Sequence, residues 1–340
     1  MSRLSGVSAK HGLPSLADTL GLLGAFVASE LEGMERELNT LPRRDDLVGQ
    51  SAAHLMSLGG KRIRPLCVAL SGRMGQPDPM VLRKLAGAVE LVHSATLLHD
   101  DVVDQGTLRR GKPTACALYG NAASVFGGDW LLIEALRRVR QAGVPGLLDR
   151  LLDIIDEMIQ AESIQLERRG QIAADEATYF RVIEGKTAAL FRWAMVAGGR
   201  AGGLDDDACA ALERYGNHLG VAFQIVDDAL DIDGAPREMG KALFTDLREG
   251  KMTYPLIVGM SRDPKLVGLL EEAVLGSGDV PPSVGEQLLG SLRASGAIDA
   301  AHDKAREHAE LGAAALNGLP EGKARSALEA VALVAANRRA

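Results

Sequence analysis

Apolar residues recur at spacings of three and four along most of the chain, which is the period of a helix with one buried face. Ala, Leu, Glu and Arg dominate, and alternating β-branched runs are scarce. No Ser- or Pro-rich linker divides the chain, so one all-α domain is the simplest organisation. The pattern predicts helices over residues 18–38, 47–58, 81–104, 121–141, 147–168, 175–198, 205–231, 253–260, 283–294, 298–314 and roughly 322–337.

Two of the predicted helical segments, Leu85–Asp104 and Gly216–Asp233, are apolar on most of their circumference. A soluble helix of this kind lies at the centre of a bundle. Both segments reach the same pattern, Asp-Asp-x-x-Asp, so we expect their acidic residues to be buried or to cluster at the helix ends.

These patterns place six carboxylates on otherwise apolar helices. Asp100 and Asp104 are four residues apart and share a helix face, with Asp101 on its flank. The second pattern repeats the arrangement with Asp227, Asp228 and Asp231. Buried, unpaired carboxylates are costly, and Mg²⁺ prefers oxygen ligands. A solvated helix end would explain one triplet, but two matching triplets favour a metal site. The runs Asp205–Asp207 and Asp45–Asp46, by contrast, predict helix starts.

The charge balance restricts the partners of the chain. With 38 basic and 45 acidic residues the net charge is −7, which argues against a nucleic-acid or anionic-membrane surface. An anionic ligand would therefore need a local cluster of bases, although a lone basic loop is usually only surface. Candidate bases suited to diphosphate oxygens occur in three places: Lys61, Arg62 and Arg64; Arg109, Arg110 and Lys112; and Lys186, Lys241 and Lys251.

Other motifs are weaker. Glu184–Thr187 ends like a phosphate-binding loop, but the leading glycine of that motif would fall at Phe180. His93 lies two helical turns before Asp100 on the same face, so it is either a core histidine or a ligand contact, and we favour the contact.

The cysteines and the N-terminal segment indicate the compartment. Cys67, Cys116 and Cys209 are widely spaced, which fits a reducing environment. The first 15 residues hold no apolar stretch typical of a signal peptide, and Leu85–Leu98 is too short to span a bilayer. We expect a cytoplasmic protein without stable membrane insertion.

In their order along the chain, the motifs resemble those of the trans-isoprenyl diphosphate synthases, or polyprenyl synthetases. The resemblance rests on GGKRIRP, LLHDDVVDQGTLRRGKPT, GKTAALF and FQIVDDALDIDG, followed by GK and DLREGKMTYPLI. It implies an isoprenoid synthase fold of ten or more helices around a deep central cavity, usually as a homodimer. The likeness runs from about residue 15 to the C-terminus, and we expect a flexible N-terminus over residues 1–14 and a single polyprenyl synthetase domain over residues 15–340.

The resemblance implies a Mg²⁺-dependent prenyltransferase that condenses isopentenyl diphosphate with an allylic diphosphate. Its catalytic residues would be Asp100, Asp101, Asp104, Lys186, Asp227 and Asp228. Three Mg²⁺ ions would be held by the two triplets, Asp231 included. The isopentenyl diphosphate site would comprise Lys61, Arg64, His93 and Arg110. The allylic diphosphate site would comprise Arg109, Lys186, Thr187, Gln224, Lys241 and Lys251. Gly128, Asp129 and Gln165 also match the family, without an assigned role.

Two residues depart from the family pattern. Phe244 stands where Gly is usual, and Tyr254 stands where Leu is common. Both changes could narrow substrate choice or slow turnover, yet every metal and diphosphate position is intact, so we expect an active enzyme.

In this family the residues four and five before the first motif limit the length of the product. Here they are Thr96 and Ala95, small side chains that would leave a tunnel open to a C30–C50 product. Both could instead be packing residues, and Trp130 or Leu136 could form a lower floor. A geranylgeranyl or farnesyl product is the main alternative. A class I terpene cyclase, a non-catalytic partner subunit and a purely structural bundle fit the two complete Asp motifs less well.

Overall fold

The structure is a computed structural model, and it describes residues 14–172, 175–234, 243–275 and 280–337. Residues 1–13 of the expected flexible N-terminus lie outside this range. The chain forms two compact units. The first contains Met1–Asp153, Leu190–Arg214 and Leu316–Ala330, and the second contains Ile154–Ala189, Tyr215–Ala315 and Val331–Ala340. The single domain remains a prediction.

The first unit is built from helices. It holds α2 (Pro14–Leu38), α3 (Leu47–Ser57), α4 (Ile63–Gly72), α5 (Pro79–Val103), α6 (Ala115–Tyr119) and α7 (Asn121–Ala142), together with a hairpin of β1 (Leu108–Arg109) and β2 (Lys112–Pro113). Helix α5 starts where Asp78 caps it, the Met80 amide donating to the Asp78 carboxylate over 2.7 Å. Pro79 occupies the first turn, where its missing N–H costs nothing.

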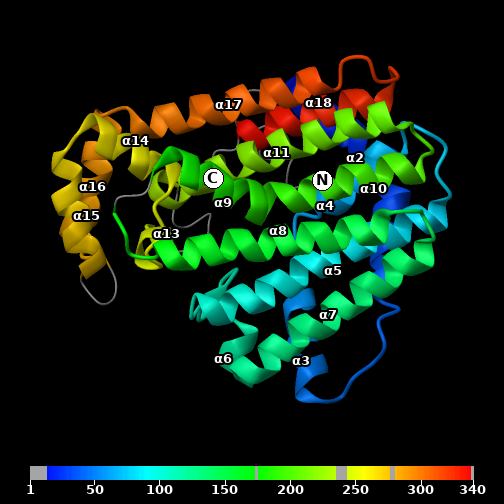
Figure 1. Ribbon diagram of the computed structural model, residues 1–340, viewed down its shortest axis with the longest axis horizontal. Coiled ribbons are helices and arrows are strands. Elements are labelled where there is room, and N and C mark those ends of the chain that lie inside the picture. Colours follow the sequence, from blue (N-terminus) through cyan, green and yellow to red (C-terminus); the bar gives the residue numbers. More distant parts are fainter. Residues whose placement is uncertain (1–13, 173–174, 235–242, 276–279, 338–340) are drawn as a thin grey trace. The chain divides into compact units, whose positions relative to one another are not determined.

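Helix α5 packs closely along α7 in the first unit (Figure 1). The close approach depends on small residues of α7: a Cβ on Gly128 would lie 2.3 Å from the His99 ring, and one on Gly127 would lie 3.3 Å from Leu98 Cδ1, both on α5. Ser124 donates to the Leu98 carbonyl over 2.9 Å. Leu85, Leu91 and Leu98 are fully buried, which confirms the prediction of a central apolar helix.

The second unit is also helical. It holds α9 (Glu176–Ile183), the π-helical turn η1 (Glu184–Ala188), α13 (Thr245–Arg248), α14 (Tyr254–Arg262), α15 (Lys265–Leu275), α16 (Pro282–Ala294) and α17 (Ala297–Ala315). Helices α13 to α16 enclose an apolar cluster that includes Phe244, Leu247, Leu266 and Leu288. The boundaries between the units fall inside α8 (Leu147–Arg168), α11 (Asp206–Asp233) and α18 (Lys323–Ala336), just after α10 (Ala189–Ala201) begins, and at the end of α17.

The all-α prediction is confirmed, and most predicted helices are found within a few residues of their expected ends. The helix starts at Asp46 and Asp205 are also confirmed, since each side chain accepts a backbone amide at 2.9 Å and 2.8 Å respectively. The expected helix 175–198 is interrupted by η1. Helices α4, α6, α13 and α15 and the hairpin were not predicted, because short elements carry too little periodicity.

Candidate active site

The first Asp triplet ends helix α5 in the first unit. Asp100 and Asp104 are partly exposed, and the Asp104 amide donates to the Asp100 carbonyl over 2.8 Å as the helix closes. The partly exposed positions of α5 include His93, Thr96 and Leu97 as well, so one stripe carries the histidine and these two carboxylates. This placement matches the face predicted for them.

Asp101 is held differently from its neighbours. It is only 3% exposed and accepts hydrogen bonds from the Arg109 guanidinium on β1. Arg109 Nη2 donates to Asp101 Oδ1 over 2.7 Å, and Nε donates to the same oxygen over 2.9 Å. A buried carboxylate with a bidentate partner is satisfied, whereas removing one partner would leave an uncompensated charge. Arg109 therefore lies beside the first triplet, as its sequence position suggested.

The candidate bases for isopentenyl diphosphate belong to the first unit. Arg64 lies over the Phe191 ring, 4.6 Å from its centroid, and Lys61 is exposed just before α4 begins. A Cβ on Gly60 would lie 3.7 Å from an Arg110 nitrogen, so the loop before α4 and the β hairpin meet. Residue types that bind diphosphate are thus gathered at one place.

The positive charges of this cluster act on His93. Desolvation lowers the pKa of His93 well below 6.5, and the charges of Arg64, Arg109 and Arg110 lower it further. His93 is consequently neutral at physiological pH and can donate one N–H without adding another positive charge.

The two residues expected to limit product length lie on different sides of α5. Ala95 is 2% exposed and shares a helix face with His99, toward Gly128 of α7. Thr96 is partly exposed on the Asp100 side, and its hydroxyl donates to the His93 carbonyl over 2.8 Å. His99, which sequence reasoning did not single out, lies 3.3 Å from the Asp129 carboxylate.

The second triplet lies near the end of α11 in the second unit. Asp228 is 3% exposed, and each of its oxygens accepts one hydrogen bond: Tyr179 Oη donates to Oδ2 over 2.7 Å and Gln224 Nε2 to Oδ1 over 2.8 Å. Burial raises the pKa of Asp228 well above 3.8, and the nearby negative charges of Asp246 and Asp227 raise it further.

Asp231 anchors the segment that follows. Its two carboxylate oxygens accept the backbone amides of Thr245 and Asp246, each over 3.1 Å, and its carbonyl accepts the Phe244 amide over 2.8 Å. The first turn of α13 is therefore fixed on a side chain of the Asp triplet. Phe244 itself adopts the left-handed conformation, with φ of 60°.

The π-helical turn η1 presents two predicted residues, Lys186 and Thr187. Such turns occur often at functional sites because the extra residue redirects side chains. Lys186 pairs with Glu162 and donates to Gln165 Oε1 over 3.1 Å, both on α8. Gln165 thereby gains a structural role that the sequence did not indicate.

Two lysines remain of the residues predicted to bind the allylic diphosphate, Lys251 and Lys241. Lys251 is 13% exposed and pairs with Glu249 over 2.6 Å. Lys241 lies outside the described residues. Tyr179 was not predicted from the sequence. It lies seven positions, or about two helical turns, before Lys186, and this spacing was the sequence feature that could have pointed to it.

The donor set fits hard divalent cations, because all six aspartates offer oxygen ligands. In the second unit the negative charges of Asp246 and Asp227 near Asp228 are of the kind that a cation would neutralise. Among the described residues no three acidic, imidazole or thiol side chains converge on one point. Asp101, Asp228 and Asp231 instead accept hydrogen bonds from protein donors.

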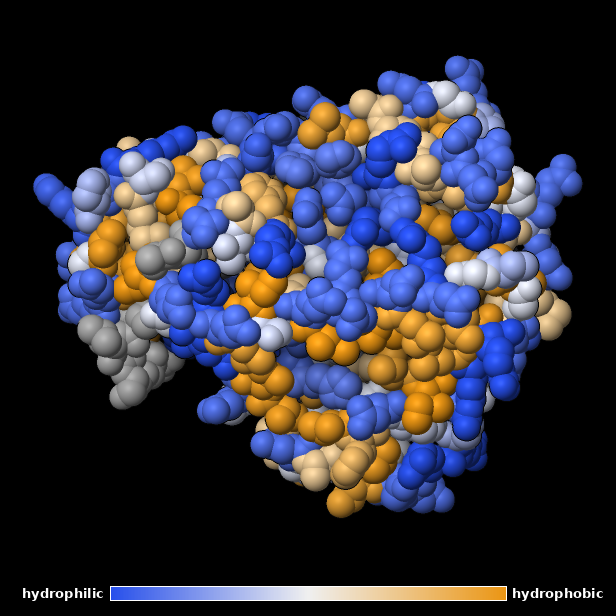
Figure 2. All heavy atoms as spheres, viewed as in Figure 1, coloured by the Kyte–Doolittle hydropathy of each residue, from blue (hydrophilic) through white to orange (hydrophobic). Residues whose placement is uncertain are grey.

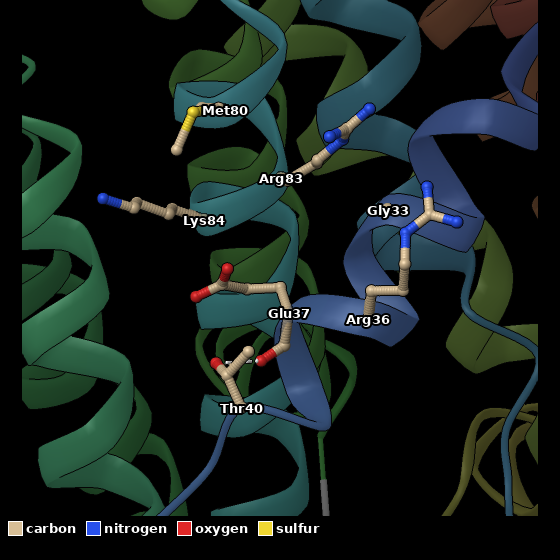
Figure 3. A pocket seen from close by; sticks show the side chains of 7 residues that line it. All are labelled: Gly33, Arg36, Glu37, Thr40, Met80, Arg83 and Lys84. Atoms are coloured by element: carbon tan, nitrogen blue, oxygen red, sulfur yellow. Dashed lines mark hydrogen bonds between the residues drawn. The ribbon is translucent and has the colours of Figure 1, made fainter.

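A separate hollow of about 160 Å³ opens between α2 and the first turns of α5 (Figure 3). Arg36, Arg83 and Lys84 line it with Glu37 and Thr40. Lys84 precedes Asp100 by more than four helical turns, so this hollow is distinct from the Asp triplet of the same helix.

The comparisons with known proteins agree with these motifs. The Polyprenyl synthetase family model matches residues 45–280, more than half of the chain. The chain belongs to the polyprenyl synthetase family. Octaprenyl diphosphate synthase of Escherichia coli is 35% identical over 319 residues, which cover 93% of this chain and 98% of that protein. Heptaprenyl diphosphate synthase component 2 of Bacillus subtilis is 33% identical over 309 residues, covering 91% of this chain and 88% of that protein.

Solved structures of polyprenyl synthetases share the fold. A polyprenyl synthase from Caulobacter crescentus, complexed with calcium and isoprenyl diphosphate, has a TM-score of 0.88 at 36% identity and covers 94% of this chain and 97% of its own. This chain is accordingly a trans-prenyltransferase of the polyprenyl diphosphate synthase class, which confirms the predicted family, fold and enzyme class.

Proposed function

We propose that this polyprenyl synthetase makes a long-chain trans-polyprenyl diphosphate of about C30–C50 by adding isopentenyl diphosphate units to an allylic diphosphate. The observation that carries the proposal is the pair of small side chains, Ala95 and Thr96, one helical turn before Asp100 on α5. The names of the octaprenyl and heptaprenyl relatives support a long product. The main alternative is a geranylgeranyl or farnesyl product.

Each substrate has its own set of bases in this proposal. Lys61, Arg64, His93 and Arg110 bind the diphosphate of isopentenyl diphosphate. Arg109, Lys186, Thr187, Gln224, Lys241 and Lys251 bind the allylic diphosphate. The neutral state of His93 suits a hydrogen-bond donor among guanidinium groups, because it keeps the repulsion within the cluster low.

The six aspartates of the two triplets would hold Mg²⁺ ions, with three per active site expected. Bound there, the ions would supply positive charge for the diphosphate leaving group of the allylic substrate. Lys186 adds a fixed positive charge at the same diphosphate, held in place by Glu162 and Gln165.

The apolar helix walls exclude water that would quench the allylic cation. The double bond of isopentenyl diphosphate attacks the allylic carbon and forms the new C–C bond, and the proton then lost from isopentenyl diphosphate passes to the released diphosphate. No side chain of the described residues stands out as the base for this step.

A product assay tests the function. Purified protein with Mg²⁺ and labelled isopentenyl diphosphate is given dimethylallyl, geranyl, farnesyl or geranylgeranyl diphosphate in turn, and the products are dephosphorylated and sized by mass spectrometry. Products of about six to ten isoprene units are expected. A sharp stop at three or four units would contradict the long-chain proposal, and no condensation with any primer would contradict activity of the chain alone.

The chain-length residues make a separate prediction. Ala95→Phe is expected to shorten the main product by at least one isoprene unit, because a ring at this buried position would narrow the tunnel that the family resemblance places beside it. Thr96→Phe, on the Asp100 side of α5, is the comparison variant. If neither variant shifts the product masses, the floor lies elsewhere, for example at Trp130 or Leu136.

We expect the enzyme to be a homodimer in the cytoplasm without stable membrane insertion. No helix among the described residues is long and apolar enough to cross a membrane. The name of the Bacillus relative, component 2, favours one further candidate, in which this chain works with a different partner subunit. Condensation by the purified chain without additions would exclude that requirement.

A further inference from the structure

A chain of hydrogen bonds in the second unit links three separate segments. Thr187 of η1 donates to Gln224 Oε1 over 2.7 Å, and Gln224 Nε2 donates to Asp228 Oδ1 over 2.8 Å within α11. Tyr179 of α9 completes the chain by donating to Asp228 Oδ2 over 2.7 Å. The sequence separates Tyr179 from Asp228 by 49 positions, so only the fold brings them together.

The two donors, Tyr179 Oη and Gln224 Nε2, fix the orientation of the Asp228 carboxylate. Each oxygen of the Asp228 carboxyl group accepts one of these hydrogen bonds, which leaves its other lone pairs for further contacts. The remaining lone pairs keep a fixed direction only as long as both donors hold the group. In metal centres, donors that do not touch the ion orient the carboxylates in this way, and their loss typically weakens metal affinity by about 10–100-fold.

The Tyr179 ring is itself held by neighbouring rings. It is 7% exposed and packs against Phe180 at 5.4 Å and Tyr254 at 5.6 Å between centroids. Phe180 in turn stacks on His308 at 5.8 Å. Tyr254, which departs from the family pattern, therefore packs against Tyr179, the residue that donates to Asp228.

We propose that Tyr179 is a positioning residue, whose hydroxyl fixes Asp228 for the Mg²⁺–diphosphate complex and, through Asp228, holds the Gln224 amide that accepts a hydrogen bond from the Thr187 hydroxyl. The inference rests on the proposed function, because it takes the second Asp triplet as the metal site. A purely structural tyrosine would satisfy the buried carboxylate without affecting metal binding, and this difference makes the role testable.

The decisive variant is Tyr179→Phe, which removes one oxygen and keeps the ring among Phe180 and Tyr254. We expect the Mg²⁺ concentration for half-maximal activity to rise about tenfold and kcat to fall, with the KM for isopentenyl diphosphate unchanged. Independently of turnover, Mn²⁺ bound in the presence of inorganic diphosphate, measured by electron paramagnetic resonance, should weaken by about the same factor. Tyr119→Phe, on α6, removes the same atom elsewhere and should change none of these values.

An unchanged Mn²⁺ affinity and Mg²⁺ dependence in Tyr179→Phe, in a protein with the wild-type melting temperature, would overturn the proposal. A drop in melting temperature without a change in Mn²⁺ affinity would also overturn it, since it would assign Tyr179 to stability alone. Failure of the proposed function is distinguishable, because it would appear as absent condensation in the wild-type protein, whereas the Mn²⁺ measurement needs no turnover.

Discussion

Phe244 shows how one residue can combine backbone strain with favourable packing. Its φ of 60° and ψ of 31° lie in the left-handed region, where a glycine is the usual residue and where a side chain costs about 1–2 kcal/mol. The ring is 5% exposed, and a Cβ on Gly285 would lie 3.4 Å from it. Burial of such a ring contributes about 1.5–3 kcal/mol, so packing outweighs the strain.

This balance predicts an unusual order of stability. Phe244→Gly should lower the free energy of unfolding by about 2–4 kcal/mol, because the lost ring outweighs the relieved strain. Phe244→Ala should be less stable than the glycine variant by about 1 kcal/mol, since it loses the ring and keeps the left-handed backbone. Urea unfolding of the three proteins measures the order, and an alanine variant at least as stable as the glycine variant would contradict it.

At the scale of elements, the π-helical turn depends on close contact between η1 and α8. A Cβ on Gly185 would lie 2.7 Å from the Ala161 Cβ and 3.1 Å from the Glu157 carbonyl oxygen, both on α8. Lys186, next to this glycine, makes its contacts with α8 as well. The spacing between the two elements therefore sets where the lysine lies.

Gly185→Ala is expected to destabilise the protein by about 1–3 kcal/mol, because the added methyl group must push η1 from α8. It should also lower kcat through the displaced Lys186. Gly268→Ala in α15 is the matched control: no atom lies within 4 Å of its Cβ position, so the change should be neutral or stabilise by up to about 1 kcal/mol. Equal stabilities of the two variants by urea unfolding would argue against the tight contact.

For the whole molecule, several large apolar side chains are exposed on α6 and α7 of the first unit. Phe126 is 59% exposed and Ile133, seven residues later on α7, is 49% exposed, with Leu118 of α6 also 49% exposed. Figure 2 shows hydrophobic residues on this face over α6 and α7. Residues seven apart lie on one helix face, and contiguous apolar patches of this kind mark protein interfaces.

We therefore expect the homodimer to form through this face, used by both copies in a symmetric contact. The double variant Phe126→Glu and Ile133→Glu should dissociate at concentrations where the wild type is dimeric. Met80→Glu replaces another strongly exposed apolar residue, on α5, and should leave the dimer intact. Light scattering after size exclusion gives the masses, and a double variant that still has twice the chain mass would place the interface elsewhere.

Much of the fold was predictable because helical periodicity is local. The expected helix over 147–168 has the bounds of α8, and Asp46 and Asp205 were identified as helix starts from their neighbours alone. Helix α15 was missed, since eleven residues with a glycine among them give a weak periodic signal. The π-helical turn was missed because Glu184–Ala188 has no distinct composition.

The sequence by itself determined the helical class, the family and the two Asp triplets, because periodicity and motif spacing are properties of neighbouring residues. Only the tertiary structure decided what each carboxylate contacts. Asp101 accepts hydrogen bonds from the Arg109 guanidinium, Asp228 accepts one from the Tyr179 hydroxyl, and Asp231 accepts those of the backbone amides that start α13. All of these partners come from other elements of the fold: Arg109 from β1, Tyr179 from α9 and the two amides from the start of α13. Such partners are brought together by packing and satisfy charges that burial would otherwise leave unpaired.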